Sequence, residues 1–394
     1  MRVLLLSWEY PPLVVGGLGR HVEALARELA AAGHDVRVVT RGDEATPSDE
    51  RRDGVRVYRA AADPLAIDFT TESLLAWSQA AEHTLLRAAL PLLRRWRPQV
   101  VHAHDWLVAQ SAITLAQVTG APLVTTVHAT EAGRHQGWLP RPLNLAIHSV
   151  ERWLVSRSAV VITCSTAMHD EVVRLFEPAA EQVVVVPNGI DAARWRVAGA
   201  TRQAARARFD GASPLLVFAG RLVHEKGVQT LLDAVRPLRA GHPGLRLAVA
   251  GTGVHEAVLR TRARRLRIAR LVDWLGFVPE DSLAGLLAAA DVAVVPSLYE
   301  PFGIVALEAA AAHTPLVVAR TGGLADLVSD GIATDSFAAG DSAGLVAAVE
   351  RVLADPDRAR RSVRRADRVI RRDYTWTAVA AHTAETYARV AAVS

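Results

Sequence analysis

The sequence predicts an α/β protein made of two doubly wound domains, each with a parallel sheet between layers of helices. Short runs rich in Val and Leu alternate with longer Ala-, Leu- and Arg-rich segments of helical period. Continuous apolar runs of this kind are typical of strands buried on both faces of a parallel sheet. The alternation stops near residues 188–213 and then starts again, so it forms two successive sets.

The expected strands are the short apolar runs of each set. In the first set they are Val3–Ser7, Val36–Thr40, Val55–Tyr58, Val100–Ala103, Leu123–Val127, Val160–Thr163 and Val183–Val186. In the second set they are Leu215–Ala219, Leu245–Ala250, Val272–Leu275, Val292–Pro296 and Leu316–Val318. A final helix is expected over Tyr374–Val390. Ligands of doubly wound sheets bind beyond the carboxyl ends of the strands, so the residues there are the site candidates.

Length and composition limit what the chain can be. Its 394 residues, 51% of them hydrophobic and 22% charged, indicate a globular protein of two domains. The lone Cys164 excludes an internal disulfide and favours a reducing setting. No uncharged apolar stretch approaches the ~18–20 residues of a membrane span, and the N-terminal apolar run is too short for a signal sequence. We therefore expect a soluble, cytoplasmic protein.

Positive charge is concentrated in the run Arg358–Arg372, although the net charge is only +4. The favoured interpretation of this run is a solvated helix face, and the alternative is a patch for anionic lipid or polyanions. No aromatic-interleaved basic stripe accompanies the charge, so nucleic-acid binding is not expected.

Lys226 is the only lysine among 45 lysines and arginines. It follows the strand Leu215–Ala219, Gly220 and Arg221, on a loop that leads into the next helix. A site that needs a compact point charge, rather than the planar fork of arginine, would explain the lysine. A leftover of composition on a solvated helix start is the alternative.

The first loop contains Gly16-Gly17-Leu18-Gly19 and enters a helix at about Arg20. Successive glycines allow backbone amides to approach an anion at a helix N-terminus. The spacing does not match the dinucleotide fingerprint, because Val22 occupies the place of its third glycine. A Walker loop at Gly220 to Lys226 is excluded in the same way by Glu225. A simple tight turn is the alternative for the glycine pair.

The motif with most chemical content is Glu300-Pro301-Phe302-Gly303-Ile304-Val305-Ala306-Leu307-Glu308. Glu300 lies on the loop after a strand, and Glu308 lies one to two turns into the following helix. A carboxylate at that depth on an inward face requires hydrogen-bond donors, which a ribose diol would supply. The free amides of residues 302–304 suit a sugar hydroxyl or a phosphate. An acidic helix start alone would explain Glu300 but not Glu308.

His128 and Asp105 each follow a buried strand of the first set, where ligand-facing residues belong. A satisfied structural histidine is the alternative for His128. His102 and His104 resemble a metal-binding pair, but no carboxylate-rich ligand set completes it. Asp355-Pro356-Asp357 is better explained as a helix stop and restart than as a metal motif. We therefore expect no metal.

These motifs together resemble the retaining GT-B glycosyltransferases of family 4, which use nucleotide-sugar donors. The resemblance covers essentially the whole chain and rests on the Glu300/Glu308 pair, Gly220-Arg221 with Lys226-Gly227, Gly16-Gly17 and Pro187-Asn188-Gly189-Ile190-Asp191. Within the family, the segments Ser7-Trp8-Glu9-Tyr10-Pro11-Pro12 and His102-Ala103-His104-Asp105-Trp106 are similar to the glycogen-synthase-like branch that extends α-glucans.

The resemblance implies a GT-B fold, with two Rossmann-like domains facing across a cleft and a last helix that crosses back to the first domain. It implies an acceptor-side domain over residues 1–190, completed by residues 374–394. Residues 191–373 would form the donor domain.

The resemblance also assigns roles. Arg221 and Lys226 would hold the donor diphosphate, Gly16-Gly17 would approach it, and Glu308 would bind the ribose. Glu300, with the backbone of Phe302, Gly303 and Ile304, would bind the transferred sugar. His128 would lie at that sugar, with Asp105 and Glu131 on the acceptor side.

The implied activity is retaining glucosyl transfer from ADP- or UDP-glucose to the non-reducing end of an α-1,4-glucan, either glycogen or a methylglucose-lipopolysaccharide-type glucan. The nucleotide sugar is a substrate, and no cofactor or metal is implied. One alternative with the same fold is a mannosyl- or glucosyltransferase that acts on a lipid acceptor at a membrane surface. A further alternative is a sugar-nucleotide epimerase, which needs no acceptor.

Overall fold

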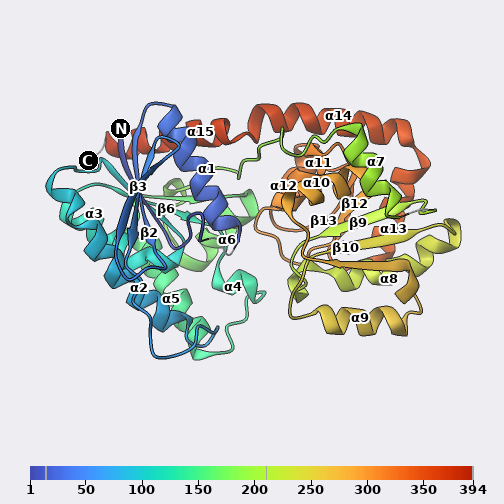
Figure 1. Ribbon diagram of the computed structural model, residues 1–394, viewed down its shortest axis with the longest axis horizontal. Coiled ribbons are helices and arrows are strands. Elements are labelled where there is room, and N and C mark those ends of the chain that lie inside the picture. The colour runs from blue at the N-terminus through green and yellow to red at the C-terminus, as the bar shows by residue number, and fades with distance from the viewer. Residues whose placement is uncertain (14–15, 210, 393–394) are drawn as a thin grey trace. The chain divides into compact units, whose positions relative to one another are not determined.

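The computed structural model describes residues 1–13, 16–209 and 211–392, and it divides into two compact units (Figure 1). Unit 1 comprises Met1–Gly189 and Trp376–Ser394, and unit 2 comprises Ile190–Thr375. Residues 14 and 15 of the first glycine-rich loop and the last two residues of the expected segment 374–394 lie outside the described part. Each unit is a largely parallel sheet covered by helices, so the predicted doubly wound α/β class is confirmed.

The sheet of unit 1 has the order β3-β4-β2-β1-β5-β6-β7-β8 and is parallel except for the pair β3 and β4. Its strands are β1 (Arg2–Ser7), β2 (Asp35–Arg41), β3 (Ser48–Arg52), β4 (Val55–Ala60), β5 (Val100–His104), β6 (Leu123–Val127), β7 (Val160–Thr163) and β8 (Val183–Val185). The chain runs outward in one direction from β1 and in the other from β5. Their carboxyl ends therefore flank the topological switch point, where such sheets bind ligands.

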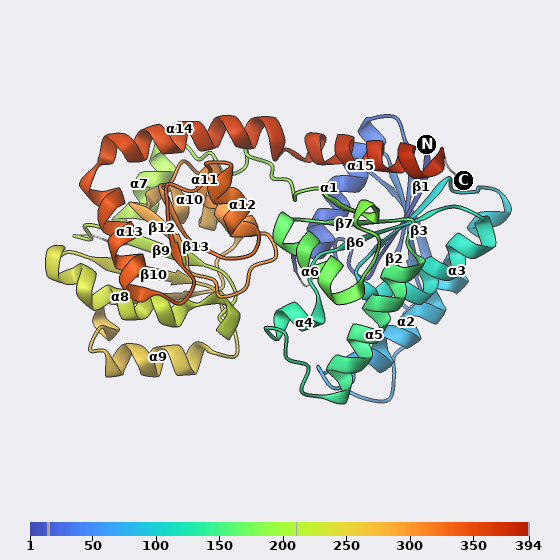
Figure 2. The same ribbon diagram turned by 180° about the vertical axis from the view of Figure 1, so that it is seen from behind.

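Helices cover both faces of the unit 1 sheet (Figures 1 and 2). Val3 and Leu5 of β1 pack in one core with residues of α1 and α15, whereas Leu4 and Leu6 pack in another with α2, α3 and α5. This alternation follows from the two-residue period of a strand and explains why β1 is apolar throughout. The helices are α1 (Gly17–Ala31), α2 (Leu74–Ala89), α3 (Ala109–Thr119), α4 (Glu131–Arg134), α5 (Pro142–Arg157), α6 (Thr166–Phe176) and α15 (Trp376–Ala391), with short 3-10 turns η1 (Leu92–Arg94), η2 (Trp106–Val108) and η3 (Ala180–Gln182).

The sheet of unit 2 is entirely parallel, in the order β11-β10-β9-β12-β13-β14. Its strands are β9 (Leu215–Ala219), β10 (Arg246–Ala250), β11 (Val272–Gly276), β12 (Val292–Val295), β13 (Leu316–Arg320) and β14 (Asp335–Ala338). The chain direction reverses between β9 and β12. The loops after these two strands therefore flank the switch point of this unit.

A layer formed by α8, α9 and α13 closes the main core of unit 2 over Leu216 and Phe218 of β9. On the other face α7 packs on α10, and α11 packs on α14 (Figure 2). The helices are α7 (Gly199–Ala207), α8 (Val228–Gly241), α9 (Glu256–Arg265), α10 (Glu280–Ala289), α11 (Ile304–Ala311), α12 (Gly323–Ser329), α13 (Ser342–Ala354) and α14 (Pro356–Asp373), with η4 (His224–Lys226) and η5 (Ala269–Leu271).

Three elements differ from the sequence expectation. Neither β3 nor β14 was predicted. β3, with the sequence Ser-Asp-Glu-Arg-Arg, carries no apolar residue and is formed by antiparallel pairing at the sheet edge. β14 is short and has one buried side chain, Phe337. Helix α1 begins at Gly17 instead of about Arg20, with Gly16 as its N-cap. The expected stop and restart at Asp355-Pro356 is confirmed, because the Asp355 carboxylate accepts from the Arg358 amide at 2.8 Å.

Among the residues that the structure describes, no helix is both long enough and apolar enough to cross a membrane.

Candidate active site

In unit 2 the two loops at the switch point are joined by Lys226 and Glu300. Lys226 Nζ, on the loop after β9, donates to Glu300 Oε2, on the loop after β12, at 2.7 Å. Ser297 Oγ donates to the same carboxylate oxygen at 3.0 Å. The side chains of Lys226 and Glu300 are only 19% and 11% exposed. A shielded pair of this kind is stronger than a surface ion pair, because water screens it less.

Glycines hold these loops at distances that no other residue permits. A Cβ atom on Gly227 would lie 1.9 Å from the Pro296 carbonyl oxygen, and one on Gly322 would lie 1.9 Å from that of Glu300. Both glycines also have positive φ angles, of 66° and 50°. Since a side chain would push the loops apart, glycine at these positions keeps the Lys226–Glu300 pair in place.

The other predicted donor residues of unit 2 lie on the same edge. Helix α11 begins after Gly303, whose φ is 104°, and the Phe302 side chain is buried near the Tyr374 ring. Glu308 is buried in the second turn of α11. Arg221 differs from them, because its side chain is 67% exposed and lies 3.8 Å from Glu225. The structure thus joins Lys226 to Glu300 and leaves the guanidinium of Arg221 mostly exposed to solvent.

In unit 1 the predicted residues Asp105 and His128 are in contact at the ends of β5 and β6. The Asp105 carboxylate accepts from the His128 amide at 2.7 Å and also from the Ala129 amide. Asp105 has a φ of 61° and a ψ of 175°, a strained conformation for a residue with a side chain. Burial raises the pKa of Asp105 to about 6. Strain and a shifted pKa on one residue are typical of functional sites.

His128 belongs to a cluster with His21 of α1 and His104 of β5. The ring centroids of His21 and His128 are 4.6 Å apart, and His104 Nδ1 lies 3.2 Å from His128 Nε2. Burial lowers the pKa of His128 to about 3 and places the pKa values of His21 and His104 well below the ordinary range. The rings are therefore uncharged at neutral pH. They present polar but neutral groups at the unit 1 switch point.

His102, which has the same burial, has a structural role. Its Nδ1 lies 2.6 Å from the Tyr387 hydroxyl, and its Nε2 lies 2.7 Å from Thr126 Oγ1. Both ring nitrogens are thus used within unit 1.

Gly16 and Glu131 lie on separate loops of unit 1. The Gly16 amide, before the first turn of α1, donates to Glu9 Oε2 at 2.9 Å, and Gly17 begins the helix. Glu131 begins α4, and its carboxylate accepts from Asn144 Nδ2 at 2.6 Å. Its amide donates to Glu151, whose pKa burial raises to about 8.

Sequence reasoning missed His21 and the glycines Gly251 and Gly322. His21 lies one turn after Gly17, but a lone histidine in an amphipathic helix has the pattern of a core residue. A Cβ on Gly251 would lie 1.9 Å from the Gly220 carbonyl oxygen. The two glycines could have been found from their positions in the sequence, because Gly251 directly follows strand β10 and Gly322 closely follows strand β13.

The Arg358–Arg372 run lies on α14, and several of its guanidinium groups have acidic partners on α14 or on β14. Arg358 contacts Asp335 at 2.9 Å, and Arg371 contacts Asp367 at 3.0 Å. Asp357 interacts with Arg360, Arg361 and Arg364, which together lower its pKa.

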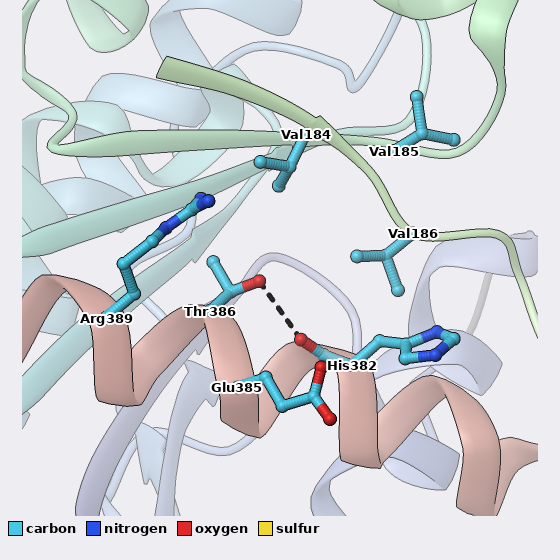
Figure 3. A pocket seen from close by; sticks show the side chains of 7 residues that line it. All are labelled: Val184, Val185, Val186, His382, Glu385, Thr386 and Arg389. Carbon is cyan, nitrogen blue, oxygen red and sulfur yellow. Dashed lines mark hydrogen bonds between the residues drawn. The ribbon is translucent and has the colours of Figure 1, made fainter. Parts of the chain in front are cut away.

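An open pocket of about 370 Å³ in unit 1 lies apart from the predicted residues (Figure 3). Val184, Val185 and Val186 at the edge of the sheet face His382, Glu385, Thr386 and Arg389 of α15 across it. The Thr386 hydroxyl donates to the His382 carbonyl at 3.0 Å. One side of this pocket is formed by three valines, and the Thr386 hydroxyl on the other side is already hydrogen-bonded within α15. Few polar groups therefore point into the pocket together, and it is not the candidate site.

Comparisons with known proteins agree with this geometry. Residues 16–189 match the model of the glycosyl transferase 4-like domain, and residues 200–369 match that of glycosyl transferases group 1. A protein named glycogen synthase from Mycobacterium tuberculosis is 48% identical over 98% of this chain and 94% of its own length. The chain belongs to the glycosyltransferase family of glycogen synthase. The predicted family and enzyme class are thereby confirmed.

Solved structures agree on the fold of this glycosyltransferase. Sucrose-phosphate synthase from Thermosynechococcus elongatus has a TM-score of 0.82 at 24% identity and covers all of both chains. The catalytic domain of starch synthase IV from Arabidopsis thaliana, bound to ADP and acarbose, has a TM-score of 0.75 at 21% identity over 99% of each chain. These likenesses confirm the predicted GT-B fold.

Proposed function

We propose that this glycosyltransferase moves glucose, with retention of anomeric configuration, from ADP- or UDP-glucose to the non-reducing end of an α-1,4-glucan. The acceptor would be glycogen or a methylglucose-lipopolysaccharide-type glucan. The observation that carries the proposal is the Lys226–Glu300 contact at the unit 2 switch point, which joins a cation suited to a diphosphate to a carboxylate suited to sugar hydroxyls. The relative named glycogen synthase supports the glucan acceptor. We place the reaction in the cytoplasm, since a chain with one cysteine has no internal disulfide to form in an oxidising compartment.

The donor diphosphate is bound by cations of unit 2 and by backbone amides. Breaking the glycosidic bond leaves negative charge on the departing diphosphate, and cations already in place stabilise that charge as it develops. Lys226 supplies a fixed point charge, and the exposed guanidinium of Arg221 can bind two phosphate oxygens. Gly17 offers its amide at the start of α1, and the Gly16 amide joins it once it leaves the Glu9 carboxylate. With these groups the leaving phosphate needs no metal ion.

The sugar and the nucleoside are bound by carboxylates and amides. Glu300 and the backbone of residues 302–304 bind the transferred glucose, and Glu308 binds the ribose hydroxyls. Neutral His128 lies at the sugar, and its main chain, fixed by Asp105, lies near the anomeric carbon. Glu131 lies on the acceptor side.

In the transfer step the bond between the anomeric carbon and the phosphate oxygen breaks. The acceptor 4-hydroxyl forms the new bond on the same face of the sugar. The proton of that hydroxyl passes to the departing phosphate oxygen, so the step requires no protein base. Direct attack on the same face requires no protein nucleophile.

The test is incubation of the full chain with UDP-glucose, ADP-glucose and GDP-mannose, each with and without maltooligosaccharide, followed by analysis of chain length. Extension with one of the glucose donors is expected, with nucleotide release only when acceptor is present. Nucleotide-sugar isomerisation without acceptor would show the epimerase instead. Failure to extend maltooligosaccharide, together with salt-sensitive sedimentation on anionic liposomes, would show the lipid-acceptor transferase.

A further inference from the structure

Three histidines of unit 1 converge from three different elements: His21 from α1, His104 from the end of β5 and His128 from the loop after β6. One ring nitrogen of each lies within 4.8 Å of one ring nitrogen of each of the others. His104 Nδ1 and His128 Nε2 are 3.2 Å apart. Two nitrogens bound at ~2.0–2.1 Å to a tetrahedral zinc ion are separated by about 3.4 Å. The cluster is therefore close to the spacing of a metal site.

The surroundings of His21 orient its ring for such a role. Asn188 Oδ1 lies 2.9 Å from His21 Nδ1, and because a carbonyl oxygen accepts, that nitrogen carries the proton. The lone pair is then on Nε2. Metal-binding histidines normally donate their second N–H to an acceptor in this way, which fixes the ring.

Within the described part of the chain, one ring nitrogen of the three histidines is buried without a hydrogen-bond partner. His104 is fully buried, and its Nε2 has no hydrogen-bond partner in the described part of the chain. A buried polar atom in that state is costly and calls for an explanation. His102, two residues earlier on the same strand, has both ring nitrogens bonded. His102 is thus fully engaged within the protein, whereas a metal ion bound to His104 Nδ1 would leave the proton of that ring on Nε2.

We propose that His21, His104 and His128 bind a divalent transition metal ion such as Zn²⁺. Three imidazoles form a ligand set that zinc favours, and the fourth position is left to water or a ligand oxygen. The three nitrogens, which lie within 4.8 Å of one another, have to approach to about 3.4 Å to share one ion.

Metal binding would inhibit transfer. The ion engages the ring of His128, which the proposed function places beside the donor sugar, so metal and donor exclude each other. This consequence rests on the proposed function, whereas the metal site itself does not.

The test is titration of the chelator-treated full chain with Co²⁺, followed by visible absorption and by calorimetry with Zn²⁺. We expect one equivalent of Co²⁺ with the intense absorption of a four-coordinate site. His21→Gln should weaken binding tenfold or more, and Asn188→Ala, which releases the ring of His21, should also weaken it by 10- to 100-fold. His83→Gln, at an exposed histidine of α2, is the matched control and should bind like the wild type. Circular dichroism confirms that each variant folds. If His21→Gln does not fold, the binding affinity of Asn188→Ala tests the proposal instead.

Equal binding by wild type, His21→Gln and Asn188→Ala would overturn the proposal, because the ion would then bind elsewhere, for example at His242 and Glu350. Failure of the wild type to bind one equivalent would overturn it as well. Inhibition of chain extension by Zn²⁺, relieved by excess donor, is expected. Binding at the cluster without inhibition would retain the metal site but contradict the place given to His128.

Discussion

The two units use the carboxyl edge of the same kind of sheet for different chemistry. In unit 1 the edge carries uncharged imidazoles around His128 and a carboxyl group, Asp105, whose pKa burial raises to about 6. In unit 2 the edge carries the ion pair of Lys226 and Glu300, on loops that glycines hold together. Topology fixes where a ligand binds, and the residues after the strands decide which part of it each edge suits. A neutral polar edge suits sugar hydroxyls, and an edge that carries an ammonium group beside a carboxylate suits a phosphate together with a sugar.

The two units also treat buried carboxyl groups in opposite ways. In unit 1 burial raises the pKa of Glu82 to about 7 and that of Glu151 to about 8. In unit 2 burial alone would raise the pKa of Asp335, but hydrogen bonds from Arg351 and Arg358 outweigh it and lower that pKa. The two arginines thus keep Asp335 ionised, whereas Glu82 and Glu151 of unit 1 lack partners strong enough to offset burial.

The largest effect that would sharpen the comparison is expected from the cation of unit 2. Lys226→Ala should lower chain extension by about 100-fold or more, the usual scale for removing a group that stabilises charge in the transition state. Lys226→Arg should also be clearly impaired, because a planar fork does not replace a point charge. The rate of nucleotide release measures the transfer activity of each variant, and circular dichroism shows whether the variant is folded. Arg239→Ala, on the exposed surface of α8, is the control and should leave activity unchanged.

Near-normal turnover of Lys226→Arg would break the point-charge argument. Normal turnover of Lys226→Ala would remove Lys226 from the site altogether.

The next effect concerns the glycines that hold the unit 2 loops. Gly322→Ala should destabilise the protein by about 3 kcal/mol or more, since its Cβ would lie 1.9 Å from the Glu300 carbonyl oxygen. Gly276→Ala shares the positive φ, at 65°, but its Cβ would meet no atom within 4 Å, so it should cost only the backbone strain of about 1–2 kcal/mol. Urea unfolding of both variants measures the free energy lost in each, and the difference between them is the cost of the steric clash beyond backbone strain. Equal costs would show that close approach does not hold the loops.

A smaller effect is expected from the pH dependence of Asp105. Its pKa is raised from 3.8 to about 6, so its contribution to stability is fully present below pH 3.8 and is lost as pH rises through about 6. Wild type should therefore lose at most about 3 kcal/mol relative to Asp105→Asn between pH 4 and pH 7. Unfolding by urea at several pH values measures the difference. Asp335→Asn is the flat control, because the lowered pKa of Asp335 gives wild type an advantage that is already complete above about pH 3.8 and stays constant between pH 4 and pH 7.

A pH-independent difference between wild type and Asp105→Asn would contradict the raised pKa. Loss of transfer activity in Asp105→Asn, despite greater stability at pH 7, would show that the ionised carboxylate serves function at a cost in stability.

The sequence predicts the buried strands well and the contacts between distant loops poorly. Strands such as β6 and β9 are recovered residue for residue, because a strand covered on both faces must be apolar throughout. β3 is missed, since pairing rather than burial forms it. Lys226 and Glu300 were both singled out, yet for different parts of the ligand, and only the fold shows that they touch. His21 could not be found, because its significance depends on β5 and the loop after β6. The roles given to these residues stay predictions.

The smallest effect is expected from substitution of the arginines of α14. These variants test whether the cations of unit 2 that take part in transfer lie only at the carboxyl edge of its sheet. Arg364→Gln should leave stability essentially unchanged, because this exposed side chain attracts only weakly the exposed carboxylate of Asp357. Arg358→Gln should cost somewhat more, about 0.5–1 kcal/mol, since Arg358 contacts the more buried Asp335 at 2.9 Å. Neither change should alter extension of maltooligosaccharides. If Arg364→Gln abolished transfer while leaving the fold intact, cationic function would extend along α14 and the contrast between edge and surface would fail.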